Sequence, residues 1–383
     1  MNNEDRISNQ QCTMNNVQWK KVKLGDCLTI GNGQDYKHLQ SGDIPVFGTG
    51  GVMTFVDTFL YDGETVCIGR KGTINKPMYY NGKIWTVDTL FYTHSFSNVF
   101  PKFIYYVFCN IDWNKYNEAT GVPSLSKETI YKIEISIPSL PVQRRIAAIL
   151  SSADKVIAST QKVIDKLKQI KQGMMDDLLK PKDGWRMVKL GECCAINPKT
   201  DTTKVLDDDI ITFIRMEDVS NEGFITSFRE KDYKSLKKNG FTRFQNDDVI
   251  FAKITPCMEN GKGALVRNMK SVICMGSTEF HVLRAGENVL IDFIYQLTIS
   301  KNFRQKAEMK MIGSAGQQRV PTSFLENCLI SIPFQNGIPD LAEQRRIAQI
   351  LQGIDSKIAA EEKVLGKYKA VKKGLMEKLL NGK

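Results

Sequence analysis

QRRIA at residues 143–147 is the key to the architecture, because the same five letters return at residues 344–348. From there the two copies align without a gap for 37 residues. Apolar residues recur at spacings of three and four along each copy, which is typical of a helix with one apolar face. The period therefore predicts two long helices, over 143–180 and 341–383, each roughly 55 Å long at ~1.5 Å per residue.

The apolar positions of both helices predict the seam of a coiled coil. One irregularity falls near Lys171, where we expect Ile170 to occupy the seam. The matched glycines Gly173 and Gly374 each cost about 1 kcal/mol relative to alanine in a helix, so either a close backbone approach or a local helix break is expected there. The residues expected in the seam are Ile146, Leu150, Ile157, Ile164, Leu167, Ile347, Leu351, Ile354, Ile358 and Leu365.

The repeat also includes the beginning of each copy. WKKVKLGDC at residues 19–27 returns as WRMVKLGEC at 185–193, and ISIP at 135–138 returns at 330–333. The openings lie 166 residues apart but the helices 201 apart, so the interior of the second copy is 35 residues longer. Similar ends around dissimilar middles indicate one duplicated frame that carries two different surfaces.

Connectivity sets the direction of the two helices. If their seams bury each other, the second helix must run back toward the first globular domain, so the pair is antiparallel. The predicted fold class is therefore a duplicated α/β (α+β) domain, joined by a long antiparallel two-helix coiled coil into a pseudo-twofold dumbbell. The predicted parts are a disordered tail (1–16), a first globular domain (17–142), a first spacer helix (143–180), a second globular domain (181–340) and a second spacer helix (341–383).

The globular domains are expected to combine short strands and helices. Runs rich in apolar and β-branched residues, bounded by turn residues, predict strands, and longer periodic runs predict helices. Closing strands are expected just before each long helix. The predicted strands are 65–68, 83–87, 132–137, 209–214, 248–253, 272–274 and 328–332, and the predicted helices are 100–109 and 291–303.

The positive charge is concentrated in the long helices. Of the net charge of +11, the segments 143–180 and 341–383 carry +4 and +5, while residues 1–142 are neutral. A concentrated basic surface favours an anionic partner such as nucleic acid, although a solvated lysine-rich helix face is the alternative. The nine cysteines form no CxxC pair and the three histidines lack metal-ligand spacing, so we expect reduced thiols in a cytoplasmic protein. We expect no membrane-spanning segment, because no run of about eighteen apolar residues is present.

A search for catalytic motifs yields two partial matches. Pro339-Asp340 followed by Glu361-Glu362-Lys363 resembles the PD-(D/E)xK nuclease pattern, but the two parts lie roughly 30 Å apart by helix rise. That chemistry needs carboxylates gathered around Mg²⁺. Asn197-Pro198-Lys199-Thr200 begins like the Asn-Pro-Pro-aromatic motif of amino-methyltransferases but departs from it after the first proline. We therefore expect no catalytic and no metal-binding residues.

Polar, basic and glycine-rich loops fill the divergent middles. Residues 67–76 follow a strand in the first copy and correspond to 251–263 in the second; 120–125 and 316–323 follow later. Arginine and glutamine can read guanine and adenine edges, while lysine, serine and backbone N–H groups hold phosphates. Solvated turns are the alternative for any one loop, but recurrence at equivalent places favours DNA contact. The candidate DNA-binding residues are Arg70, Lys71, Thr73, Lys76, Ser124, Lys127, Arg215, Lys253, Lys262, Gln317, Gln318 and Arg319.

A variable domain followed by a QRRIA helix, and the same arrangement again, resembles the specificity subunits of type I restriction–modification systems. The resemblance rests on residues 19–25, 135–150, 185–191 and 330–351. It implies that each globular domain is a target-recognition domain for one part of a split, asymmetric DNA target.

The same resemblance implies the partners of the chain. They are double-stranded DNA, two methyltransferase (modification) subunits that bring S-adenosylmethionine, and, for restriction, a nuclease subunit that uses Mg²⁺ and ATP. No cofactor is expected on this chain, and no catalysis. Two other classes stay open: a stand-alone DNA nuclease or methyltransferase, which a cleavage assay with divalent metal would reveal, and a coiled-coil scaffold that reads no sequence.

Overall fold

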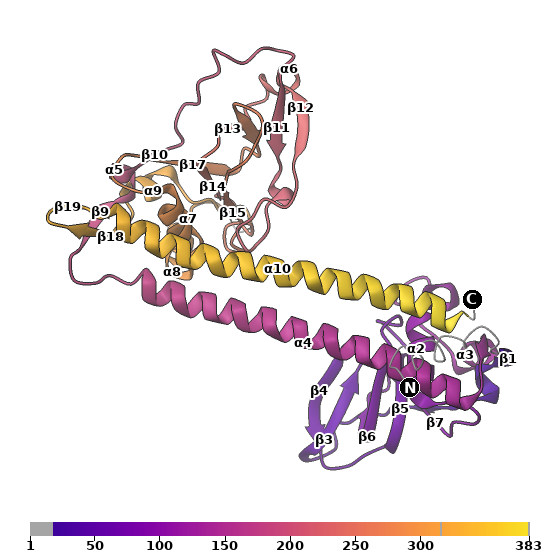
Figure 1. Cartoon of the computed structure of the whole chain (residues 1–383). Coiled ribbons are helices and arrows are strands. Elements are labelled where there is room, and N and C mark those ends of the chain that lie inside the picture. The colour runs from indigo at the N-terminus through magenta and orange to yellow at the C-terminus, as the bar shows by residue number, and fades with distance from the viewer. Residues whose placement is uncertain (1–17, 315, 382–383) are drawn as a thin grey trace, which may run out of the picture. The chain divides into compact units, whose positions relative to one another are not determined.

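The computed structural model describes residues 18–314 and 316–381, which fold as two compact units. The first unit extends to residue 162 and takes in the chain again from residue 362, and the second unit covers the residues between. Helices α4 (Leu140–Leu178) and α10 (Leu341–Leu380) each supply one part to each unit (Figure 1). Both predicted long helices are confirmed, and the predicted tail lies outside the described residues.

A six-stranded sheet forms the centre of the first unit, in the order β2-β7-β5-β6-β3-β4. Its pairs are antiparallel except for β3 with β6. Because apolar clusters cover both faces, β5 is buried at five consecutive residues and not at alternate ones. The elements are β2 (Thr29–Asn32), β3 (Ser41–Gly48), β4 (Gly51–Val56), β5 (Tyr61–Gly69), β6 (Met78–Thr86), β7 (Leu90–His94), α2 (Pro101–Asn110) and η2 (Trp113–Tyr116).

Two four-stranded sheets build the second unit, in the orders β10-β17-β14-β15 and β12-β11-β16-β13. Side chains from both sheets, among them Phe244, Ile250 and Val282, form one buried cluster. The elements are β10 (Cys194–Ile196), β11 (Ile210–Ile214), η3 (Met216–Asp218), β12 (Arg229–Asp232), α6 (Tyr233–Leu236), β13 (Thr242–Phe244), β14 (Asp248–Ala252), β15 (Gly263–Leu265), β16 (Cys274–Gly276), β17 (Phe280–Ala285), α7 (Ile291–Ile299) and α8 (Lys301–Glu308).

Two sequence predictions are wrong in detail here. The strand expected at 272–274 is found two residues later, as β16. The single helix expected over 291–303 is divided into α7 and α8, because Ser300 has an extended backbone and its hydroxyl accepts a hydrogen bond from the Phe303 N–H (3.3 Å). A serine in this conformation caps a new helix and does not continue the old one.

The repeated segments form a common frame at the base of each unit. β1 (Lys20–Lys23) pairs antiparallel with β8 (Glu134–Ile137), and β9 (Trp185–Lys189) pairs with β18 (Leu329–Gln335). The opening of each copy therefore binds the strand that leads into its long helix. The smaller frame elements are η1 (Leu24–Asp26), α3 (Lys127–Lys132), α5 (Leu190–Cys193), α9 (Thr322–Asn327) and β19 (Ile338–Pro339).

The repeated glycine of the opening has a steric reason. A Cβ atom at Gly25 would lie 3.0 Å from the Tyr131 Cβ on α3, and one at Gly191 would lie 2.8 Å from the Glu326 carbonyl oxygen on α9. Only glycine lets the opening approach the short helix this closely.

The glutamine of QRRIA explains why this motif is repeated. Gln143 and Gln344 are fully buried. The Oε1 atom of Gln143 accepts a hydrogen bond from the N–H of Phe100 (2.8 Å), and that of Gln344 from the N–H of Leu290 (2.8 Å). Phe100 and Leu290 are the N-caps of α2 and α7. Each glutamine thus satisfies a backbone group that the helix leaves unpaired, and ties the long helix to its domain.

The ends of the long helices pack antiparallel inside each unit. In the first unit, the Lys372 Nζ atom on α10 lies 2.5 Å from an Asp154 carboxylate oxygen on α4. In the second unit, the Lys171 Nζ atom on α4 lies 2.6 Å from an Asp355 oxygen on α10. Asp154 and Lys171 are the sequence counterparts of Asp355 and Lys372, so the same ion pair forms in both units.

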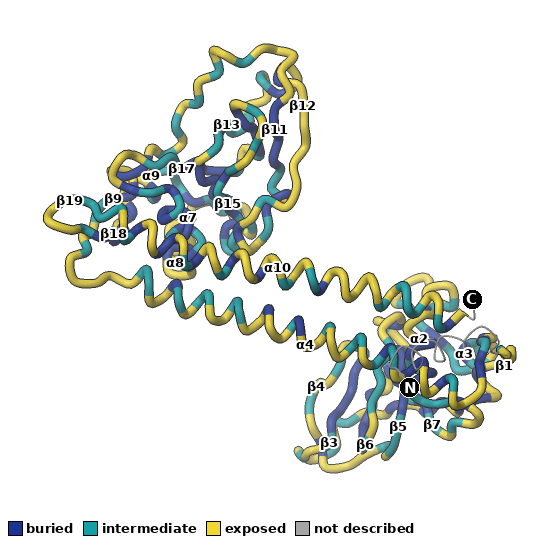
Figure 2. The backbone as a smooth tube through the Cα atoms, viewed as in Figure 1, coloured by how far each residue is buried: buried dark blue, intermediate teal, exposed yellow. Residues whose placement is uncertain are grey.

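This ion pair corrects the expected seam. The Lys171 side chain is only 13% exposed, while Ile170, expected to take its place, is 43% exposed. Lysine can occupy the seam because the buried carboxylate compensates its charge. Of the ten predicted seam residues, Ile157, Leu167 and Ile354 are half-buried and the others are buried. Along both long helices, buried and half-buried positions alternate with exposed ones (Figure 2).

The helix glycines also differ from expectation. A Cβ atom at Gly173 or Gly374 would meet no atom within 4 Å, and both helices are continuous. Neither a close approach nor a break in the described structure accounts for them.

Candidate nucleic-acid interface

The first unit brings two of the predicted loops side by side. The Leu125 N–H donates to the Arg70 carbonyl (2.9 Å), and the Gly72 N–H donates to the Pro123 carbonyl (2.8 Å). Lys71 and Ser124 form an isolated β-bridge between these bonds. The loop that follows β5 and the loop that precedes α3 therefore make one surface, which we call the first reading site (residues 69–76 and 117–127).

Cations gather on the first reading site. The Arg70 guanidinium lies 5.8 Å from the centre of the Phe91 ring, and the Lys127 Nζ atom lies 5.9 Å from it. Partial burial, and secondarily the charge of Arg70, lower the pKa of Lys127. Among the described residues neither cation makes an ion pair, and Lys71, Thr73 and Lys76 are exposed in the same loop. The site therefore presents positive charge at Arg70, Lys71 and Lys76, whose side chains are exposed.

The second unit repeats the pairing of loops. The Val320 N–H donates to the Lys253 carbonyl (2.8 Å), and the Thr255 N–H donates to the Gln318 carbonyl (3.0 Å). Ile254 and Arg319 form the equivalent isolated β-bridge. We call this surface the second reading site (residues 253–263, 277–281, 312–314 and 316–322). Structural equivalence of the two sites follows from the frame, since in both units the loops leave the end of a central strand and lead into the short helix before the closing strand.

The second reading site contains partners that the sequence analysis missed. Glu279 binds Arg319 through both carboxylate oxygens (2.9 and 3.0 Å). This ion pair, ahead of the opposing effect of burial, lowers the pKa of Glu279. The buried His281 donates from Nε2 to the Val320 carbonyl (2.8 Å), and its Nδ1 accepts from the side-chain amide of Asn197 (3.1 Å). Burial lowers the pKa of His281, so it is neutral near pH 7 and fixes the backbone of the loop.

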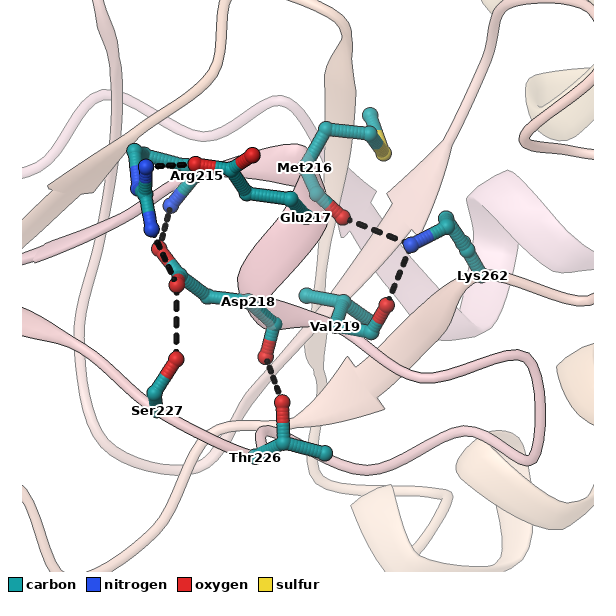
Figure 3. A network of polar contacts seen from close by, with 8 residues as sticks. All are labelled: Arg215, Met216, Glu217, Asp218, Val219, Thr226, Ser227 and Lys262. Atoms are coloured by element: carbon teal, nitrogen blue, oxygen red, sulfur yellow. Dashed lines mark hydrogen bonds and ion pairs between the residues drawn. The ribbon is translucent and has the colours of Figure 1, made fainter. Parts of the chain in front are cut away.

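Two predicted DNA-binding residues are used inside the fold (Figure 3). The Arg215 guanidinium donates to both carboxylate oxygens of Asp218 (2.9 Å each) and forms an ion pair with Glu217. The Lys262 Nζ atom donates to the main-chain carbonyls of Met216 (2.9 Å) and Val219 (2.6 Å). Both side chains therefore hold the η3 turn, and the structure gives them a structural role.

Asp218 is the centre of this turn. Its side chain is almost fully buried and accepts a further hydrogen bond from the Ser227 hydroxyl (2.7 Å), while its carbonyl accepts from the Thr226 hydroxyl (3.0 Å) (Figure 3). The Arg215 hydrogen bonds, which outweigh the effect of burial, hold the pKa of Asp218 well below its usual range. The carboxylate is thus ionised at all ordinary pH values.

The two partial catalytic motifs take structural positions. The Asp340 carboxylate accepts a hydrogen bond from the Glu343 N–H (2.9 Å) at the start of α10, and Glu361 and Lys363 lie within that helix. Asn197, from the methyltransferase-like stretch, holds Val282 and His281. In the described part of the chain, no group of three His, Cys, Asp or Glu side chains could hold a metal ion. Over the same residues, no helix is long and apolar enough to cross a membrane.

These observations define a class: a duplicated α/β protein whose two paired-loop surfaces stand on a common frame. The chain belongs to the family described as type I restriction modification DNA specificity domain, whose model matches residues 16–169 and 182–367. Two copies of the domain are matched, in agreement with the internal repeat.

The chain is similar to specificity subunits of type I restriction enzymes. The chain is 42% identical over 168 residues to the type I restriction enzyme EcoAI specificity subunit of Escherichia coli, which covers 43% of this chain and 27% of that protein. It is 25% identical over 354 residues to the MjaVIII specificity subunit of Methanocaldococcus jannaschii, covering 85% and 78%. The chain thus spans about a quarter of the first relative and most of the second.

Solved structures share the fold. The S subunit of a type I restriction–modification system from M. genitalium matches with a TM-score of 0.63 at 14% identity, covering 96% of this chain and 97% of that one. A chain from a study of type I complex assembly and conformational transition matches with a TM-score of 0.54 at 15% identity, covering 95% and 98%. The predicted class, mixed α/β domains joined by long helices, is confirmed.

Proposed function

We propose that this chain is the DNA sequence-specificity subunit of a type I restriction–modification complex. Its two domains read the two parts of a split, asymmetric target, and its long helices position methyltransferase and nuclease subunits. The observation that carries the proposal is the pairing of basic loops at equivalent places on both copies of the frame. Because the loops differ in sequence and length, the two parts of the target differ too.

The subunit has no catalytic activity of its own in this proposal. The partner methyltransferase brings S-adenosylmethionine, and the nuclease brings Mg²⁺ and ATP, so the chain works in the cytoplasm beside DNA. Purified chain incubated with DNA and labelled S-adenosylmethionine should transfer no methyl groups until the methyltransferase is added. Transfer by the chain alone would disprove this division of labour.

A row of apolar residues on α4 is suited to the methyltransferase. Val156, Val163 and Ile170 are spaced by seven residues and are 43%, 47% and 43% exposed. Seven-residue spacing places them along one side of the helix, and an exposed apolar row of this kind marks a protein contact. The counterpart of Ile170 on α10, Val371, is also exposed, at 57%.

Charge substitutions in this row test the contact. The double variant Val156→Glu, Val163→Glu should keep the fold, because the side chains already face water, and should fail to assemble with the methyltransferase in size-exclusion chromatography. Lys155→Glu on the neighbouring exposed position is the matched control and should assemble. Assembly of the double variant with unchanged affinity would place the contact elsewhere.

A further inference from the structure

Arg319 differs from Arg70, the arginine of the first reading site, in how its donors are used. A guanidinium has five N–H groups. In Arg319, Nε and Nη2 each donate to Glu279 (3.0 and 2.9 Å), and Nη1 donates to the Gln317 carbonyl (3.1 Å). Two N–H groups are left, one on each terminal nitrogen, and both lie in the guanidinium plane that Glu279 holds. The side chain is 41% exposed.

The backbone of Arg319 is fixed as well. Its N–H donates to the Ile312 carbonyl (2.8 Å), and its carbonyl accepts from the Ile312 N–H (3.0 Å). Glu279 is held in turn, because its carbonyl accepts from the Lys253 N–H (2.9 Å) and its N–H donates to the Ser277 hydroxyl (3.2 Å). The guanidinium plane is therefore set before any ligand arrives, which removes an ordering cost that binding would otherwise carry.

Charge argues against a phosphate as the ligand of Arg319. Glu279 neutralises the arginine, so the pair adds little to the attraction for the DNA backbone, which depends on uncompensated cations. What the pair offers is direction: two N–H donors in a fixed plane. In the major groove, guanine presents the matching pair of acceptors, O6 and N7, and a fixed arginine fork is the side chain that reads them.

We infer that Arg319 reads one guanine of the target through its two remaining N–H groups, and that Glu279 is the positioning residue that makes this contact selective. The inference rests on the proposed function and adds one base pair to it: the part of the target read by the second domain contains an invariant G·C pair.

The test is a double-mutant cycle that combines a base substitution in the DNA with Arg319→Ala and measures DNA binding by the assembled methyltransferase complex. The methylated motif is first read from host DNA. Duplexes carrying this motif are then made with 7-deazaguanine, which lacks the N7 acceptor, at one guanine at a time. At one of these guanines, the substitution should weaken binding by the wild-type complex roughly tenfold. Arg319→Ala should bind the unmodified duplex roughly 5- to 150-fold more weakly and show no further loss at that same position.

Variants of Glu279 separate positioning from simple folding. Glu279→Gln removes a negative charge, so its affinity for DNA without the motif should rise slightly, while its preference for guanine over adenine at this position should fall. A residue needed only for folding would lower both affinities. Arg319→Lys keeps the charge without the fork, and should lose the preference while the thermal unfolding temperature stays near that of the wild type.

Arg346 provides the matched control, because it binds Glu343 through two similar hydrogen bonds (2.6 and 2.7 Å) on α10, outside the reading loops. Arg346→Ala should retain the full 7-deazaguanine effect. A motif without an invariant guanine, or an Arg319→Ala loss that is equal on all duplexes with every 7-deazaguanine effect intact, overturns the inference. Failure of the wild-type complex to prefer any sequence would instead overturn the proposed function.

Discussion

The two reading sites share one backbone arrangement and use opposite electrostatics. In the first site, Arg70 and Lys127 flank Phe91 without a carboxylate partner among the described residues. In the second site, Arg319 is bound to Glu279, and nearby Arg215 is bound to Asp218. Uncompensated cations favour the phosphate backbone, while arginines held by carboxylates favour directed contacts or none.

Loop position alone therefore does not assign a role to a basic residue. Arg215 and Arg319 both lie in polar loops of the second domain. The Asp218 carboxylate that holds Arg215 is almost fully buried and fixes a turn of the fold, whereas the Glu279–Arg319 pair is partly exposed. Which partners a cation has, and how deeply they are buried, separates structural from reading residues.

The largest effect on stability is expected when Asp218, which holds the η3 turn of the second unit, is removed. Asp218→Ala leaves Arg215, Ser227 and the turn without their acceptor, and removing one partner of a buried pair costs about 3–5 kcal/mol in the free energy of unfolding. Urea unfolding should show this loss in the second unit only. Asp207→Ala removes an exposed partner of Lys237 in the same unit and should lower the free energy of unfolding far less, because solvent screens exposed ion pairs. Equal losses for both variants would mean that the turn is not a special anchor.

Acid should weaken the second unit by the same route. The folded state holds the pKa of Asp218 below its unfolded value of about 3.9. Its contribution is therefore present well above that value and is lost as the pH falls through it toward the folded pKa. Thermal unfolding between pH 5 and pH 2 should show a steeper decline for the wild type than for Asp218→Asn. Parallel curves would assign the acid sensitivity to other carboxylates.

The two equivalent ion pairs of the long helices should differ in strength. Lys171 and Asp355 are 13% and 7% exposed, while Lys372 and Asp154 are 21% and 35% exposed. Asp355→Ala leaves a lysine more deeply buried, so it should cost about 2–4 kcal/mol, and Asp154→Ala about 1–2 kcal/mol. Chemical unfolding of both variants checks the order. A larger cost for Asp154→Ala would point to its hydrogen bond from Tyr106 (2.7 Å) as the main contribution.

Arg70 should act in binding and Arg215 in folding. Arg70→Ala should cost about 1–3 kcal/mol of DNA affinity if it contacts a base edge. If it contacts only phosphate, the loss should be uniform across sequences and the salt slope should fall by about 0.9. Arg215→Ala should lower the unfolding temperature without changing the preferred sequence. A changed sequence preference in Arg215→Ala would instead show that this residue takes part in reading the DNA.

The smallest effect is expected at the helix glycines. Gly173→Ala and Gly374→Ala place a methyl group in open space. Alanine also lowers the conformational entropy of the unfolded chain, so each substitution should stabilise the protein by about 0.5–1 kcal/mol. Thermal unfolding of the isolated chain measures this. Stabilised variants that no longer assemble with the methyltransferase would show that the partner needs the glycines.

The frame could be predicted from the sequence because duplication marks it. Every segment that repeats, from the WKKVKLGDC opening to QRRIA, lies in the frame, and apolar spacing gave the long helices to within a few residues. The sequence also held an unused hint: an aspartate and a lysine 17 residues apart occur at matching places in both long helices, as Asp154 with Lys171 and Asp355 with Lys372.

The reading sites were harder because their contacts are long-range. The sequence located the loops, but nothing near Arg319 in the chain points to Glu279, 40 residues away. The partner of Arg215 is local, because Asp218 follows it by three residues. An arginine so close to an aspartate is typical of a turn contact, so this pair could have been predicted from the sequence. The buried role of Gln143 likewise depends on Phe100, which lies in the divergent part of the chain.

The most direct test of the account is an exchange of the first domain. Residues 1–142 are replaced by the corresponding domain of a homologous specificity subunit with a different motif, and the host expressing the chimera with the methyltransferase is examined by methylome sequencing. Independent reading sites on a common frame predict a methylated motif with one part changed, the other part kept, and the spacing between them kept. A motif changed in both parts would contradict the account.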